Sequence, residues 1–539
     1  MVASFLVLLH RTDAQDVSHA SQQIPGTIDQ NAQEGDETAY GLALWPIPSK
    51  DPNDPLLWPA SKKYTILFLV SAYSFLANSS LFGASVYVNY LAVRFNKTPD
   101  ETSRLVTYPN LLFGLGSLVF VPLYHRLGRR PVMLMSLIIY NTGLLGCALS
   151  NSYDTLLALR IVHGFGSSVC EALPAQAVTD IFFLHERGKA LSWYTFTGSL
   201  GALPASYMLG TKGSYRNFFW TEFAIGATLF VATFFFFEET MYFRQSNPPQ
   251  TLPTEVNESG GKGDDEQLEF KNEVTDNEPS QLRRKSWVQQ LKVIDRIDRG
   301  SPIIMMIVRS FTYYIVPPVF WVCSTYGMVI GLAGLVFTST FPVIVAAPPY
   351  NWPVENIGLI SLAGLVGYFA AAGPFSTVPD ILAAFLTRRN KGIREAEFRL
   401  WCLVPVFFVS PAALILYAYS AEKHFHWAAL VVAIGLFQFG AFFYLTYTLA
   451  YALDAYEANI PEMLIAMNIG KQSISFGFGF GALEWIAKHG YIRVVGGIFC
   501  GVLVINNLAT VIFLLWGKPL RKWFSDTWLA KLHRRNIRE

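Results

Sequence analysis

Between residues 111 and 140, two long apolar runs are joined by a short basic link that reads YHRLGRRP. A charged side chain in hydrocarbon costs several kcal/mol, so Arg126, Arg129 and Arg130 must lie outside a bilayer, and basic loops favour its cytoplasmic side. Gly128 permits a tight reversal of the chain. The stretch therefore predicts two membrane helices joined by a short cytoplasmic turn.

The composition supports a membrane protein independently of this stretch. Hydrophobic residues make up 52% of the chain and charged residues 15%, whereas a soluble domain carries about 25% charged residues. The formal net charge is +2 and the basic residues are scattered through polar stretches, which excludes nucleic-acid binding. The cysteines all lie in apolar runs, where they act as small hydrophobic residues, so we predict neither disulfides nor a metal site: Cys147, Cys170, Cys323, Cys402 and Cys500.

Twelve apolar blocks follow one another along the chain, six on each side of a polar segment. The blocks lie at about 64–87, 103–123, 132–150, 155–178, 190–210, 218–237, 310–343, 356–378, 402–420, 427–451, 462–486 and 494–516. They predict an all-α membrane protein with 12 transmembrane helices in two six-helix halves around a central cavity. The predicted units are a disordered cytoplasmic tail at 1–60, an N-terminal half at 61–240, a cytoplasmic linker at 241–300, a C-terminal half at 301–517 and a basic cytoplasmic tail at 518–539.

Lysine and arginine gather on one side of this predicted arrangement. With an internal N-terminus, the short cytoplasmic loops hold about 10 basic residues and the external loops about eight, and the linker and the C-terminal tail add about nine and about seven on the cytoplasmic side. We therefore predict that both termini are cytoplasmic. The sequon Asn96-Lys97-Thr98 then lies outside, where Asn96 can be glycosylated, whereas the sequon at Asn257 falls in the cytoplasmic linker.

The basic link resembles the signature loop of the major facilitator superfamily. That loop reads GxLxDRxGRRxxL between the second and third spans, and this chain has VPLYHRLGRRPVML. Arg126, Gly128, Arg129 and Arg130 match the family positions, while His125 stands where the family has an aspartate. The resemblance implies the major facilitator fold, with these four residues in a loop that gates the cytoplasmic side.

Other segments resemble the fungal multidrug and metabolite exporters of the same superfamily. Arg160 and Gly164 match the RxxxG pattern of the fourth span, HERG at 185–188 matches an inner loop, and RRNKGIREAEFRLW at 388–401 resembles the NxGxxxPEFRL loop. The antiporter motif of the fifth span is matched in part by 197–210. The resemblance implies a secondary transporter without a cofactor that exports a drug or secondary metabolite by alternating access, in exchange for protons.

Ionisable side chains inside apolar blocks point to function, because helix packing rarely needs a charge. Arg160 and Glu171 are eleven residues apart on the predicted fourth span, which places them on one face about 16 Å apart, able to share a cavity wall but not to pair. Lys471 forms a polar stripe with Asn468, and Asn78 belongs to a similar stripe on the first span. We predict that these five residues serve proton coupling or line the substrate cavity. Interhelical hydrogen bonding is the alternative for the asparagines.

Glu171 is the residue at which we expect proton coupling. Burial favours its protonated form, whereas an approaching cation, from a substrate or from Lys471, favours the ionised form. A carboxyl balanced between these states can bind a proton when the cavity faces one side and release it on the other. Arg160 would bias that release electrostatically.

Other functions fit the sequence less well. There is no GxxxxGK[ST] loop and the nine histidines are scattered, so we expect neither ATP hydrolysis nor a metal-dependent enzyme. Proton-symport uptake of a polar or cationic nutrient is the alternative to efflux, and composition alone leaves a channel or sensor open. We expect a monomer in the plasma membrane, or alternatively the vacuolar membrane, whose partners are a small-molecule substrate, protons and lipid.

Overall fold

The computed structural model describes most of the predicted helices. It covers residues 27–29, 49, 51–183, 186, 190, 193–194, 197–198, 201, 215–242, 286–290, 292–293, 303–352, 356, 360–375, 377–390, 393–455, 460–525 and 527–534. The predicted span at 190–210, the HERG loop and most of the predicted linker, with the sequon at Asn257, fall largely outside these residues. Nine helices of the described part are long and apolar enough to cross a membrane.

The N-terminal half is built from long helices that alternate in direction. They are α3 (Ala60–Gly83), α5 (Pro99–Leu127), α6 (Arg129–Leu149), α7 (Tyr153–Ser167) continued by α8 (Val169–Ile181), and α11 (Tyr215–Phe236), with η3 (Ala84–Tyr87) and α4 (Val88–Phe95) between α3 and α5. The predicted fourth span is therefore two helical segments that meet at Ser168.

The C-terminal half has more interruptions. Its elements are α13 (Ile303–Thr312), η4 (Tyr313–Ile315), α14 (Pro317–Ile330), η5 (Gly331–Phe337), α15 (Thr338–Ala346), α17 (Ile360–Phe375), α18 (Val378–Arg389), η6 (Ala396–Leu403), α19 (Val406–Glu422), α20 (Trp427–Ala455), α21 (Ile460–Gly479), α22 (Ala482–His489), η7 (Ile492–Phe499), α23 (Cys500–Ser525) and α24 (Trp528–Arg534). The last long helix continues well past the predicted boundary at 517, because Arg521 and Phe524 are buried and hold its final turns against the bundle.

Local sequence signals fix the two ends of α5. At its start, Thr98 and Glu101 form a capping box, in which each side chain bonds the backbone N–H of the other residue. At its end the chain turns at Gly128, whose φ of 106° is a conformation that side chains with a Cβ rarely adopt. The helical hairpin that the sequence predicts is therefore closed by the predicted glycine.

Two short strands connect the N-terminal tail to the C-terminal half. β1 (Thr27–Asp29) pairs antiparallel with β2 (Ile393–Glu395), with Ile28 opposite Arg394. The tail at 1–60 was predicted to be disordered, but it contains this strand and also η2 (Pro55–Leu57), which is capped by the side chain of Asp54. A three-residue strand without hydrophobic alternation gives no sequence signal.

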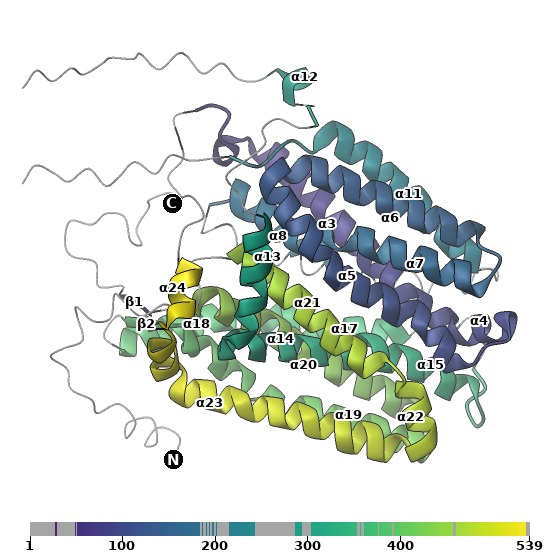
Figure 1. Cartoon of the computed structure of the whole chain (residues 1–539). Helices are drawn as coiled ribbons and strands as arrows, with labels where there is room; N and C mark the ends of the chain where they lie inside the picture. The colour runs from purple at the N-terminus through teal and green to yellow at the C-terminus, as the bar shows by residue number, and fades with distance from the viewer. Residues whose placement is uncertain are drawn as a thin grey trace, which may run out of the picture.

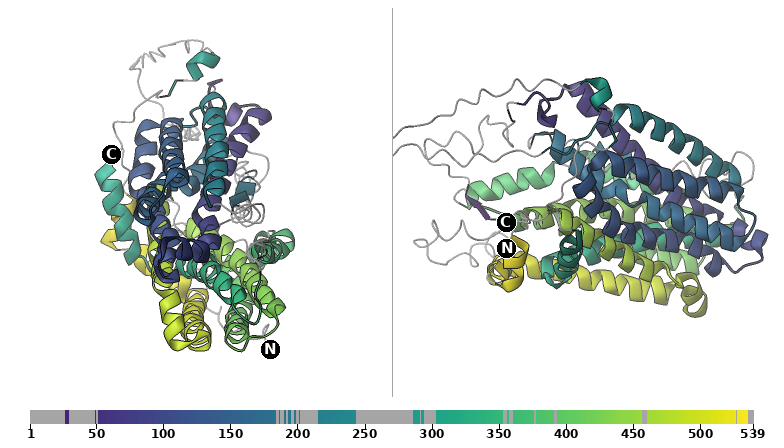
Figure 2. Two further views of the ribbon diagram at one scale, coloured as in Figure 1. Left: turned by 90° about the vertical axis from the view of Figure 1, so that its right-hand side faces the viewer. Right: turned by 45° about the horizontal axis from the view of Figure 1, so that its top comes forward.

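The two halves lie against each other along α5 and α21, which pack directly (Figure 1). The helices of the N-terminal half, coloured purple to blue, occupy one side of the bundle and those of the C-terminal half, coloured green to yellow, the other (Figure 2). β2 and α24 lie at one end of the bundle and α4 lies at the other (Figure 1). We call these the Gly128 end and the Asn96 end, after the turn that follows α5 and the residue that follows α4.

Candidate functional site

Glu171 and Lys471, which are 300 residues apart, meet between the two halves. Glu171 lies in the first turn of α8, just after the junction at Ser168, and Lys471 lies in the middle of α21. The Lys471 ammonium group donates a hydrogen bond to the Glu171 carboxylate and forms an ion pair with it. The lysine side chain is 6% exposed and the glutamate side chain 23% exposed. The pair is thus open to its surroundings only on the carboxylate side.

Aromatic rings from other helices surround this ion pair. The Lys471 nitrogen lies 6.0 Å from the ring centre of Phe113 on α5 and 5.9 Å from that of Tyr326 on α14. The hydroxyl of Tyr194 donates a hydrogen bond of 3.2 Å to the backbone carbonyl of Glu171. The ammonium group therefore faces ring π-systems as well as the carboxylate, and both kinds of partner stabilise its charge.

The halves approach closely beside the ion pair because glycine stands where α5 crosses α21. A Cβ placed on Gly114 would come within 2.6 Å of Gln472 and within 3.0 Å of the backbone oxygen of Asn468. Farther along the same contact, the Asn110 amide donates to the Ser475 hydroxyl at 3.4 Å. The predicted Asn468 is buried at this interface, one turn from Lys471, so two of the predicted residues lie together on α21.

Arg160 has a different environment from the one predicted. Its guanidinium group is fully buried and donates to the backbone carbonyls of Ser80 and Leu81 on α3 and, at 2.9 Å, of Leu105 on α5. Glu171 faces α21 instead. The expectation of a shared cavity wall assumed one continuous helix, whereas α7 and α8 meet at a junction. Arg160 thus connects three helices of the N-terminal half.

Asn78 lies where α3 comes close to Gly198 and Gly201. Its amide donates to the backbone carbonyl of Ser74 at 2.9 Å, and Cβ atoms placed on Gly198 or Gly201 would approach Ser74 or Asn78. This hydrogen bond lies within α3, so it differs from the hydrogen bonding between helices that was the alternative for the asparagines.

The predicted gating residues lie around a carboxylate at the Gly128 end. Glu239, which follows α11, accepts hydrogen bonds from the backbone N–H groups of Arg129 at 2.9 Å and Arg130 at 3.1 Å. These N–H groups begin α6, and a helix start attracts negative charge. A Cβ on Gly128 would overlap the Glu239 carboxylate, so glycine is required there both by φ and by space. Arg126 is half-buried nearby.

The side chains of the two arginines that follow Gly128 bind separate partners. Arg129 forms an ion pair with Asp180 at the end of α8, with Nε and Oδ2 3.1 Å apart. Arg130 donates to the backbone carbonyls of Phe234 on α11 at 2.7 Å and of Gln290 at 2.5 Å. Gln290 belongs to the short helix α12 (Trp287–Gln290) of the predicted linker. The loop therefore joins α6, α8, α11 and the linker.

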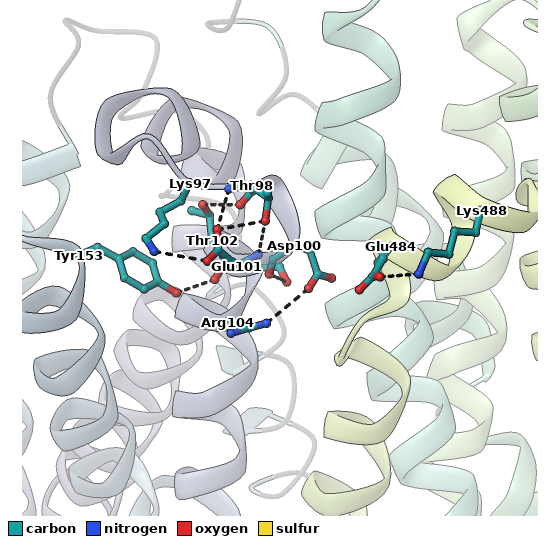
Figure 3. A network of polar contacts seen from close by, with 10 residues as sticks. Lys97, Thr98, Asp100, Glu101, Thr102, Arg104, Tyr153, Glu484 and Lys488 are labelled. Atoms are coloured by element: carbon teal, nitrogen blue, oxygen red, sulfur yellow. Dashed lines mark hydrogen bonds and ion pairs between the residues drawn. The ribbon is translucent and has the colours of Figure 1, made fainter.

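At the Asn96 end an arginine of one half contacts an aromatic ring of the other half. Asn96 is exposed in the left-handed conformation that ends α4, which leaves its side chain accessible. Figure 3 shows Arg104 with Asp100 on α5, and Glu484 with Lys488 on α22, on either side of the boundary between the halves. Arg104 also lies over the ring of Phe480, 6.0 Å from its centre.

Several buried ionisable residues were not among the functional residues predicted from the sequence. Glu222 on α11 is buried inside the N-terminal half, Glu397 on η6 pairs with Arg521 on α23, and Arg309 on α13 pairs with Glu462 on α21. Glu222 had a readable signal, since it stands within a predicted apolar block. The pairs could not be found from the sequence because the partners lie on helices far apart in the chain.

A large apolar cavity lies apart from the ion pair. It has a volume of about 710 Å³ and lies between α17 and α20, lined by residues such as Trp352, Val366, Trp427 and Leu436, which are partly exposed. Polar groups suited to orienting a ligand are scarce in its lining, so we place the candidate site at Glu171 and Lys471 instead. Among the described residues, no group of three His, Cys, Asp or Glu side chains could hold a metal ion.

Comparisons with known proteins agree on the fold and the family. The family model described as Major Facilitator Superfamily matches residues 67–479. An MFS-type transporter of Schizosaccharomyces pombe is 24% identical, over 96% of this chain and 95% of its own length. The MFS-type transporter MFS19 of Alternaria alternata is 26% identical, over 88% of this chain and 92% of its own. The solved structure of the proton:xylose symporter XylE of E. coli has a TM-score of 0.52 at 12% identity and covers 85% of this chain and 96% of XylE. The predicted fold class is confirmed.

Proposed function

The chain belongs to the major facilitator superfamily, and from this membership we propose that it exports a small organic molecule in exchange for protons by alternating access. The family makes it a multi-pass membrane transporter. Exchange for protons, the outward direction and the class of substrate are the proposed part. Export is supported by the resemblance of the loops at 185–188 and 388–401 to fungal multidrug and metabolite exporters.

The ion pair of Glu171 with Lys471 is the observation that carries the proposal. It joins α8 of one half to α21 of the other, so any rocking of the halves that separates these helices must break it. Removing one partner of a buried ion pair costs about 3–5 kcal/mol, because the other charge is left without compensation. A proton that neutralises Glu171, or a substrate charge that replaces one partner, removes this obstacle. Movement of the halves is thereby tied to proton binding.

Uptake of a cationic nutrient is the second candidate, and the exposure of the carboxylate favours it. The Glu171 side chain is 23% exposed while the Lys471 side chain is 6% exposed, so a cation can reach the acidic partner more readily than an anion can reach the basic one. In that scheme the substrate cation displaces Lys471 from Glu171. The direction of transport decides between the two candidates.

Glu171→Gln in proteoliposomes tests the proposal. Glutamine keeps the shape of the side chain but cannot ionise, so we expect transport driven by a pH gradient to be lost while exchange of substrate across the membrane without a gradient continues. Glu484→Gln, in an exposed pair on α22, is the matched control and should behave as the parent. Parental, pH-driven accumulation by the Glu171→Gln variant would show that coupling occurs elsewhere.

For the orientation, we propose that the Gly128 end faces the cytoplasm and the Asn96 end faces outward. Asn96 is exposed, so its side chain can be glycosylated if that end is external. Asn96→Gln should abolish a glycosidase-sensitive shift in mass. A shift that persists in this variant, or protease access to the C-terminal tail from outside intact cells, would reverse the orientation.

A further inference from the structure

Glu222 is an acidic residue sealed inside the N-terminal half. It lies on α11 and is 2% exposed. One carboxyl oxygen, Oε1, is hydrogen-bonded to the hydroxyl of Ser79 on α3 at 2.5 Å. The other oxygen, Oε2, is also buried and has no hydrogen-bond partner among the described residues. An ionised carboxylate in such a place would lose most of its hydration and gain one neutral hydrogen bond in return.

The nearest cation is committed to other partners. The Arg160 guanidinium lies 5.8 Å from the ring centre of Phe219, one helical turn before Glu222 on α11, so it faces the same helix. Its donors, however, bind the carbonyls of α3 and α5 described above. Arg160 is therefore close enough to interact electrostatically with Glu222 but does not form an ion pair with it.

The other titratable groups around Glu222 come from three elements. Tyr140 on α6 donates to the carbonyl of Leu76 at 3.0 Å and is within 3.1 Å of the Ser80 hydroxyl. His163 on α7 is hydrogen-bonded to the same hydroxyl at 2.8 Å. Tyr87 on η3 is the third group, and it is buried. On α3 itself, the groups facing the carboxyl are hydroxyls. Besides Arg160, none of these groups brings a fixed positive charge.

We propose that Glu222 is a proton-binding site separate from Glu171, occupied by a proton in this conformation, and that Arg160 moves to it when the proton leaves. Release takes place in a conformation that opens the site to water: the O–H bond of the carboxyl breaks and the proton passes to a water molecule. The carboxylate left behind attracts Arg160 away from the carbonyls of Ser80, Leu81 and Leu105. The protonation state of Glu222 thus selects between two positions of Arg160, one of which holds α3, α5 and α7 together.

Infrared spectroscopy of the purified full-length protein in lipid nanodiscs tests the proton site without any transport measurement. We expect a carbonyl stretching band of a protonated carboxyl at neutral pH that is lost in Glu222→Gln and kept in Glu484→Gln. In Ser79→Ala the band should persist at a shifted frequency, because its hydrogen-bond partner is gone; this variant provides the test if Glu222→Gln does not fold. An unchanged band in both Glu222→Gln and Ser79→Ala would overturn the proposal.

The coupling of Glu222 to Arg160 is tested by a separate transport measurement, and this part of the proposal rests on the proposed function. Glu222→Gln keeps the side chain neutral at every pH, so Arg160 should stay on the carbonyls and the pH dependence of substrate exchange should flatten on the alkaline side. Glu171→Gln should instead remove the response to an imposed pH gradient. Failure of proton-coupled transport in the parent would refute the proposed function while leaving the infrared result intact. An unaltered alkaline profile in Glu222→Gln would refute the coupling to Arg160.

Discussion

The two halves close the Gly128 end of the bundle with charges of opposite sign at equivalent positions. In the N-terminal half, the loop between the second and third spans is basic and the carboxylate of Glu239 comes from the end of the sixth span. In the C-terminal half, the corresponding loop contributes the carboxylates of Glu395 and Glu397, and the last span supplies Lys518 and Arg521. In both halves this loop is joined to the last span of the same half. The carboxylate comes from the span in the N-terminal half and from the loop in the C-terminal half.

The geometry of the two attachments also differs. Glu239 accepts from backbone N–H groups at the start of α6 and is half-buried, whereas Glu397 makes two parallel hydrogen bonds of 2.8 and 2.6 Å with Arg521, whose side chain is 1% exposed. A contact to backbone depends on the conformation of the chain, and a contact to a side chain depends on the identity of that residue. The N-terminal attachment should therefore be sensitive at Gly128 and the C-terminal one at Arg521.

Arg521→Ala should have the largest effect. It leaves Glu397, whose side chain is 7% exposed, as a buried charge without its bidentate partner, at a cost of about 3–5 kcal/mol. We expect a strongly lowered thermal unfolding temperature in detergent and little folded protein. Lys522→Ala, at the exposed neighbouring position, is the control and should unfold like the parent. Equal unfolding temperatures for the two variants would show that the C-terminal attachment is not held by this pair.

Gly128→Ala should be the next largest. The residue has a φ of 106°, and the added Cβ would overlap the Glu239 carboxylate, so we expect a loss of about 1–3 kcal/mol from backbone strain alone. Gly477→Ala is a matched control, because a Cβ at Gly477 meets nothing within 4 Å. Thermal unfolding of both variants measures the difference. A Gly128→Ala protein as stable as Gly477→Ala would remove the proposed sensitivity of the N-terminal attachment.

The sequence predicted the N-terminal attachment better than the C-terminal one, and the reason is local. The turn at Gly128 lies within one stretch of chain, so its glycine and arginines can be read together. The contact of Glu397 with Arg521 joins residues 124 positions apart, and which helices become neighbours depends on tertiary packing. The loop at 388–401 was recognised only by resemblance, without its partner.

At the candidate site, too, the features carried by one segment were predicted and the contacts between distant segments were not. Glu171 and Lys471 were predicted because each is an ionisable residue in an apolar block, which is a property of its own segment. Lys471 was considered, beside a substrate, only as one source of a cation that approaches Glu171; whether the two residues pair depends on how α8 and α21 meet across the two halves. Arg160 was placed on a cavity wall because the sequence does not show the junction at Ser168 that divides α7 from α8.

Arg126→Ala with Arg129→Ala tests whether the N-terminal loop gates transport. The ion pair of Arg129 with Asp180 is largely buried, but Asp180 keeps hydrogen bonds from Gln176 and Thr240, so losing the arginine should cost the fold about 1–3 kcal/mol. Even about 1 kcal/mol changes the ratio of two conformations by roughly fivefold. We expect slower transport by a protein that reaches the membrane. Arg388→Ala with Arg389→Ala removes two exposed arginines from α18 as the control, and parental turnover in the first double variant would exclude a gating role.

Glu239→Gln should change the pH dependence of stability slightly. Burial raises the pKa of Glu239 above its ordinary value of 4.5, against the opposing effect of the backbone N–H groups of Arg129 and Met241. Above pH 4.5 the unfolded chain releases this proton before the folded protein does, so the stability contributed by the site falls as the pH rises through the folded pKa and is constant beyond it. Relative to the parent, Glu239→Gln should therefore gain stability as the pH rises from 4.5. A difference between the two proteins that is independent of pH would contradict the raised pKa.

Glu484→Gln should have the smallest effect, and it tests whether burial sets the order of the others. Glu484 and Lys488 form an ion pair one helical turn apart on α22, and both side chains are more than half exposed. The hydrogen bond from Lys488 lowers the pKa of Glu484, so any stability that the pair contributes is present above pH 4.5 and is lost as the pH falls through the folded pKa. Water already solvates both charges and salt screens them, so we expect an unfolding temperature at neutral pH equal to that of the parent at both low and high ionic strength.

The pair has the same charges as Glu397 with Arg521 and lies in the same half. An effect as large as that of Arg521→Ala would mean that charge pairing itself, and not its removal from water, holds the C-terminal half together.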